Sequence, residues 1–132
     1  TSGLDRGRVD MILAVLARRA RAPIGKQDVY LSTVGGVRLT EPASDLAVAL
    51  AVASALTDRP VRASTCAFGE VGLAGEVRPV TGAHRRLSEA ARLGFRYAVV
   101  PKGVLGAGPV PPEVQVVEVG TVLEAVQALA AP

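Results

Sequence analysis

Apolar residues recur at helical spacing in four segments of this chain. In the first, 4–20, they fall on one stripe, and in the second, 43–56, nearly every residue is apolar. The first pattern predicts a helix with one buried face, and the second predicts a helix buried on most sides. A third helix is predicted over 82–93, with Gly94 closing it. Thr121 is expected to cap a short last helix that reaches Ala130.

Alternating and short apolar runs predict the strands. The segment 28–34 alternates, Gly35-Gly36 follows as a hairpin turn, and 37–39 is the expected return strand. Four further strands are expected over 64–70, 71–77 (with a turn at Ala74-Gly75), 96–100 and 114–119. Helices and strands alternate irregularly, with hairpins early and a βαβ-like section late. This order predicts a mixed α/β or α+β fold in which helices cover one sheet.

Length and composition agree with a single domain spanning 1–132. A chain of 132 residues buries about two thirds of its unfolded surface. The content of 49% hydrophobic and 20% charged residues is typical of a globular protein. No internal repeat or linker divides the chain. It shows no leader pattern and no apolar run long enough to cross a membrane, so we expect a cytoplasmic protein without a membrane partner.

The residue patterns of the chain argue against a phosphate loop, a metal site and a Ser-His-Asp triad. The Gly25-Lys26 pair lacks the glycine spacing and the following hydroxyl residue of a phosphate loop. One histidine and the single cysteine, Cys66, give no metal-ligand spacing, and Cys66 lies in an apolar run that predicts a buried thiol. A triad of Ser44, His84 and Asp45 is improbable, because adjacent helical residues diverge by about 100 degrees.

The charges of the chain are placed asymmetrically. The net charge is +3 and the sequence pI is about 9.6. Arg85, Arg86, Arg92 and Arg96 dominate a segment that carries only Glu89, whereas the chain beyond Val104 has acids and no Lys or Arg. One basic face and one acidic end favour a polyanionic partner.

Two segments resemble the catalytic frame of Lon-type proteases. The run 37–47 resembles the serine-bearing helix start of that family, and 68–82 resembles the strand, hairpin and glycine turn that lead to its catalytic lysine. On this resemblance Ala43 stands at the nucleophile position and His84 at the lysine position. Alanine has no nucleophilic atom, so a histidine base has nothing to activate. The resemblance therefore implies a degenerate dyad, with no catalytic residue, in a Lon-protease-like, ribosomal protein S5 domain 2-like fold.

The closer resemblance is to the C-terminal Lon-like domain of bacterial RadA (Sms). The segments of this chain that carry the resemblance are 4–8, 13–16, 27–30, 34–38, 41–47 and 67–73. The resemblance implies a domain excised from a DNA recombination and repair ATPase that forms hexameric rings and drives branch migration. Family members carry a zinc finger and a RecA-like ATPase that this chain lacks. ATP and zinc are therefore expected only in those domains, and no cofactor is expected here.

The first functional hypothesis is a non-catalytic domain that binds DNA and supports ring assembly. Arg85 and Arg86 lie in the first turn of a predicted helix, where the helix dipole disfavours cations, so a phosphate partner would explain them. The same surface is expected to include three further cations from loops and strand edges: Lys26, Arg59 and Arg62. With few aromatic residues, binding to single-stranded or branched DNA is expected to be sequence-independent and salt-sensitive.

Two alternatives stay open at the level of the sequence. One is a serine peptidase with a rearranged site, in which Ser44 and His84 act together. The other is a domain that only assembles a ring, through a hairpin edge near Val37 or the apolar loop at Val104-Leu105.

Overall fold

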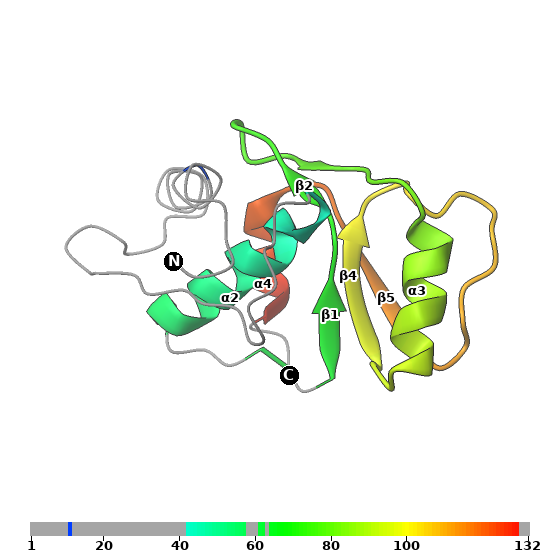
Figure 1. Ribbon diagram of the computed structural model, residues 1–132. Helices are drawn as coiled ribbons and strands as arrows, with labels where there is room; N and C mark the ends of the chain where they lie inside the picture. Colours follow the sequence, from blue (N-terminus) through cyan, green and yellow to red (C-terminus); the bar gives the residue numbers. More distant parts are fainter. Residues whose placement is uncertain (1–10, 12–41, 58–60, 63, 130–132) are drawn as a thin grey trace.

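The computed structural model describes residue 11, 42–57, 61–62 and 64–129, and Met11 among them is helical. A short 3-10 turn, η2, leads directly into α2 (Figure 1 labels α2). In chain order the elements are η2 Pro42–Ser44, α2 Asp45–Thr57, β1 Thr65–Ala67, β2 Glu70–Val71, β3 Val77–Arg78, α3 Ala83–Arg92, β4 Tyr97–Pro101, β5 Gln115–Val119 and α4 Val122–Leu129.

Three strands form a parallel sheet in the order β1-β4-β5. Cys66 pairs with Ala98, which pairs in turn with Val116. The crossover from β1 to β4 contains α3, whereas β4 reaches β5 through the loop 102–114. Strands β2 and β3 form a separate antiparallel hairpin.

Alternate side chains of the parallel strands enter two different cores. Ala67, Val99 and Val117 pack with residues of α2 and α4. Their neighbours in sequence, Cys66 and Ala98 among them, pack on the opposite face with Leu87 of α3. Figure 1 shows the sheet between α2 and α4 on one side and α3 on the other. The strands need apolar residues at nearly every position because both faces are covered.

The mixed α/β class with a helix-covered sheet is confirmed, and two expected strands are shorter than the pattern indicated. The chain leaves the sheet after β1, because the Gly69 N–H donates to the Ala43 carbonyl at 2.9 Å. The segment 72–76 is mostly a turn, closed by the Gly75 N–H and the Gly72 carbonyl at 2.9 Å. The strands expected at 28–34 and 37–39, and the helix 4–20 apart from Met11, lie outside the described residues.

The end of α3 and the start of α4 are formed by the residues that the sequence predicted. Gly94 has φ 91°, a left-handed value that side chains rarely adopt, and its N–H donates to Ala91 while the Phe95 N–H donates to Ala90. These two bonds close α3 as predicted. The Thr121 hydroxyl accepts the Glu124 N–H at 3.1 Å and caps α4. No helix within the described residues is long and apolar enough to cross a membrane.

Candidate nucleic-acid interface

The start of α2, which the sequence pattern compared with a protease nucleophile position, is built into the core by backbone bonds. Ala43 is buried in η2, and its carbonyl accepts the Gly69 N–H. The Leu46 N–H donates back to the Gly69 carbonyl at 3.0 Å. These two bonds tie η2 and α2 to the segment between β1 and β2. Ser44 is half-buried in the same turn.

Asp45 is the buried acid of this helix start. It is 1% exposed, and its Oδ2 accepts the Val71 N–H at 3.1 Å. A carboxylate in the first turn of a helix also interacts favourably with the helix dipole. Asp45 therefore joins α2 to β2 and has a structural role at the position next to Ser44.

His84 lies in the first turn of α3 and points at the loop between β4 and β5. Its Nδ1 is 2.8 Å from the Pro109 carbonyl oxygen, and its Nε2 is 2.8 Å from the Leu105 carbonyl oxygen. A carbonyl oxygen only accepts hydrogen bonds, so a ring nitrogen that carries a proton can donate to the carbonyl that it faces. His84 therefore fastens the loop to α3.

Gly108 completes this contact between the loop and α3. A Cβ at position 108 would overlap the Nε2 and Cε1 atoms of the His84 ring. Beside it, Val104 and Leu105 are half-buried against the core that α3 covers. One alternative from the sequence is that the loop at Val104-Leu105 contacts a neighbouring subunit in a ring of subunits. The structure shows that this loop is partly used in packing within the chain.

These contacts bear directly on the Ser44 and His84 hypothesis. A general base needs a ring nitrogen with a free lone pair to accept the serine proton. Both nitrogens of His84 face carbonyl oxygens instead. Ser44 is the last residue of η2, directly before α2, whereas His84 belongs to α3, and these two helices cover opposite faces of the sheet.

Arg85 and Arg86 differ in their surroundings although they are adjacent. Arg85 is exposed and forms no ion pair with any residue that the structure describes. Arg86 is half-buried, its Nε donates to the Thr81 carbonyl at 3.0 Å, and its guanidinium lies 5.9 Å from the centre of the Phe68 ring. Arg86 therefore has local contacts that the dipole argument did not foresee, whereas Arg85 has none of this kind.

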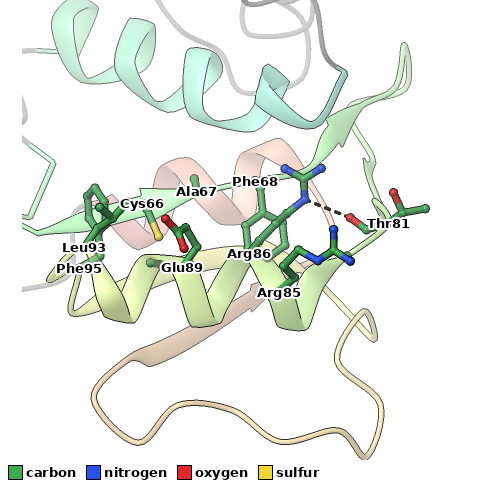
Figure 2. A pocket seen from close by; sticks show the side chains of 11 residues that line it. Cys66, Ala67, Phe68, Thr81, Arg85, Arg86, Glu89, Leu93 and Phe95 are labelled. Atoms are coloured by element: carbon green, nitrogen blue, oxygen red, sulfur yellow. Dashed lines mark hydrogen bonds between the residues drawn. The ribbon is translucent and has the colours of Figure 1, made fainter.

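A groove of about 610 Å³ runs between β1 and α3. Figure 2 shows Arg85, Arg86 and Thr81 at one end of it and Leu93 and Phe95 at the other. The closing turn of α3 places Leu93 and Phe95, and Leu93 is 60% exposed. The groove therefore has a cationic end and an apolar end.

Two ionisable groups line the middle of the groove. The side chain of Glu89 forms an ion pair with Arg92, which lowers the pKa of the Glu89 carboxyl. Burial raises the pKa of the Cys66 thiol, so the thiol stays protonated and a poor nucleophile at neutral pH. No group of three or more metal-ligating side chains occurs among the described residues.

The remaining sequence-predicted cations are not gathered at one point. Arg62 precedes β1, and its guanidinium lies 4.6 Å from the centre of the Tyr97 ring. Arg85 and Arg86 lie beyond the other end of β1, where the Arg86 guanidinium contacts the Phe68 ring. Lys26 and Arg59 lie outside the described residues.

Comparison with known proteins identifies the family. Residues 10–104 match the family model described as subunit ChlI of Mg-chelatase. The chain belongs to this family. It is 56% identical over 97% of its length to DNA repair protein RadA of Mycolicibacterium smegmatis, and 51% identical over 96% to RadA of Mycobacterium tuberculosis. RadA of Streptococcus pneumoniae is 48% identical over 94% of the chain. The resemblance to RadA drawn from the sequence is confirmed.

The chain corresponds to only part of each RadA relative. It spans 27% of the M. smegmatis protein, 26% of the M. tuberculosis protein and 30% of the S. pneumoniae protein. The similarity to RadA reaches nearly the whole chain, so it includes α2, α3 and the groove between β1 and α3.

Sequence reasoning missed the groove and its apolar end. Leu93 and Phe95 flank Gly94, and the C-terminal glycine signal that predicted the end of α3 also places them beside each other. What the sequence could not indicate is that Cys66 and Phe68 of a distant segment line the same groove.

Proposed function

We propose that this chain is a non-catalytic, DNA-binding domain of a RadA-type DNA repair protein. It binds backbone phosphates without reading base sequence, and it supports assembly of the protein into a hexameric ring for branch migration. The name of its relatives, DNA repair protein RadA, supports a role in DNA repair. The activities of the whole protein, with its ATP and zinc, belong to other domains in this proposal.

The observation that carries the DNA-binding proposal is Arg85. An exposed guanidinium in the first turn of a helix gains nothing from the helix dipole, which favours anions there. No described carboxylate neutralises it, so it can give a phosphate two-pronged hydrogen bonds. Arg86 lies beside it at the same end of the groove, and Arg62, Arg59 and Lys26 are the further cations of the proposed surface.

The absence of catalysis in this proposal rests on two positions. Ala43 supplies no nucleophile at the start of α2. His84 has both ring nitrogens directed at the carbonyls of Leu105 and Pro109, so it is a poor candidate for a general base. A serine-reactive phosphonate probe tests this directly. We expect equal and negligible labelling of the parent chain and of Ser44→Ala, and labelling that Ser44→Ala removes would establish a peptidase.

DNA binding is tested with two variants that each remove one positive charge. Arg85→Ala removes the unpaired cation, whereas Arg78→Ala removes a cation that Glu70 and Glu76 engage on the β2–β3 hairpin. We expect Arg85→Ala to lower the affinity and to reduce the slope of log affinity against log salt by about 0.7–0.9. Arg78→Ala should leave the slope nearly unchanged. Identical salt slopes in the parent chain and Arg85→Ala would contradict the assignment.

Ring assembly is tested separately by mass. Native mass spectrometry of the chain, alone and with DNA, should give species up to six copies if this domain contributes to the ring. A strictly monomeric mass at high protein concentration would contradict that part of the proposal and leave DNA binding untouched.

A further inference from the structure

The polarity of the groove between β1 and α3 matches that of a nucleotide. Its cationic end, at Arg85 and Arg86, is suited to a phosphate, whereas Leu93 and Phe95 at the other end offer apolar surface (Figure 2). Leu93 is 60% exposed, so this apolar surface is accessible from solvent. A nucleotide likewise has an anionic phosphate and a base with apolar faces.

The dimensions of the groove also fit bases. Leu93, at the C-terminal end of α3, lies eight positions after Arg85, a rise of about 12 Å. This length accommodates about three stacked bases at about 3.4 Å each. The volume of about 610 Å³ lies within the range usual for small-molecule pockets.

Glu89 sets the direction in which a nucleotide can lie. Its carboxylate lies in the middle of the groove in an ion pair with Arg92, so this stretch offers a phosphate no unpaired cation. Phosphates are therefore favoured at the end formed by Arg85 and Arg86, where two guanidinium groups lie together. A base can pass Glu89, because a neutral ring is not repelled and exocyclic amino groups can donate to a carboxylate.

We propose that this groove is a subsite for unpaired nucleobases. One or more bases of a single strand lie against Leu93 and Phe95, while the phosphate on the same strand is held by Arg85. This inference rests on the proposed DNA binding and adds to it a preference for unpaired bases, since paired bases are stacked inside a duplex and cannot enter.

The test compares two ligands and two leucine variants. The ligands are a short oligothymidine and an abasic strand of the same length, which carries the same phosphates without bases. The variants are Leu93→Ala in the groove and Leu123→Ala on α4, both of which shorten an exposed leucine, 60% and 40% exposed respectively. Binding is measured by fluorescence polarisation at low salt, and thermal unfolding verifies that both variants are folded.

We expect the parent chain to bind oligothymidine on the order of tenfold more tightly than the abasic strand. Leu93→Ala should remove most of this difference without changing the affinity for the abasic strand, and Leu123→Ala should change neither. Equal affinities of the parent chain for both strands, or an equal loss on both with Leu93→Ala, would overturn the subsite. If Arg85→Ala then lowered the affinity for both strands, the proposed DNA binding would stand without the subsite. Binding of neither strand at low salt would overturn both proposals.

Discussion

The two helix starts that resemble a protease dyad are used in different ways. At the start of α2, Ala43 and Asp45 are buried and bonded to the backbone around Gly69 and Val71. At the start of α3, His84 contacts a surface loop and Arg85 is exposed to solvent. The start of α2 therefore serves the core, whereas the start of α3 keeps charged groups at the surface.

The largest expected effect is at the buried start of α2. Asp45→Ala leaves the buried Val71 N–H without its acceptor and should lower the free energy of unfolding by about 1–3 kcal/mol. Chemical denaturation measures the change. Asp45→Asn is the matched control, because its amide oxygen can still accept the same bond, and its loss should be smaller. Equal stability of Asp45→Ala and the parent chain would contradict a structural role for this carboxylate.

An intermediate effect is expected where His84 holds the loop. In Gly108→Ala the new methyl group displaces the His84 ring, so the bonds to Leu105 and Pro109 are lost, at a cost of about 1–2 kcal/mol in unfolding free energy.

A double-mutant cycle with His84→Ala isolates this contact between position 108 and the ring. Once the ring is absent, Gly108→Ala should cost little, and the two single changes should be strongly non-additive. Additive losses would show that the glycine is needed for another reason.

A smaller loss of stability is expected for Arg86→Ala, and almost none for Arg85→Ala. Arg86→Ala loses the bond to Thr81 and the contact with Phe68, and should cost about 0.5–1 kcal/mol of stability. Arg85→Ala should leave the unfolding midpoint nearly unchanged, because Arg85 lacks such contacts. Thermal unfolding of the two variants side by side measures the difference, and a larger loss in Arg85→Ala would reverse our assignment of the two roles.

The smallest effect concerns acid pH at Glu76, in the turn of the β2–β3 hairpin. The pKa of the Glu76 carboxyl is lowered, first by a hydrogen bond from the Glu76 backbone N–H and then by one from the Arg78 side chain. The same carboxyl also accepts the Ala74 N–H. Because this pKa is lowered in the folded state, the stabilisation is present above the unfolded pKa. It is lost as the pH falls through the folded value.

The Ala74 amide signal in an NMR titration should therefore shift only at acid pH. Glu76→Gln provides the control, since its side chain does not titrate. An Ala74 signal that moves equally in both proteins would assign the shift to another group.

Much of the fold could be predicted from local patterns. The last three helices and the strands β4 and β5 follow from apolar spacing, from Gly94 and from the Thr121 cap, because these signals act over a few residues. The ends of β1 to β3 could not be predicted, since the bond between Gly69 and Ala43 joins segments distant in sequence.

The candidate site was predicted only in part. Charge placement and the resemblance named Ala43, His84, Arg85 and Arg86 from the sequence. The sequence did not distinguish Arg86, which contacts Phe68, from Arg85, which does not. A side chain's partners depend on which segments the fold brings beside it, and that information is not local.

The sequence by itself determined the α/β class and placed an alanine at position 43, because residue identity and short-range spacing carry both, and the resemblance of its motifs indicated the family. The tertiary structure alone decided that Asp45 would be buried and that both nitrogens of His84 would face a loop. It also decided that Cys66 and Phe68 would face α3 across a groove. These outcomes depend on long-range packing of the two faces of one sheet, where a residue's neighbours come from distant parts of the chain.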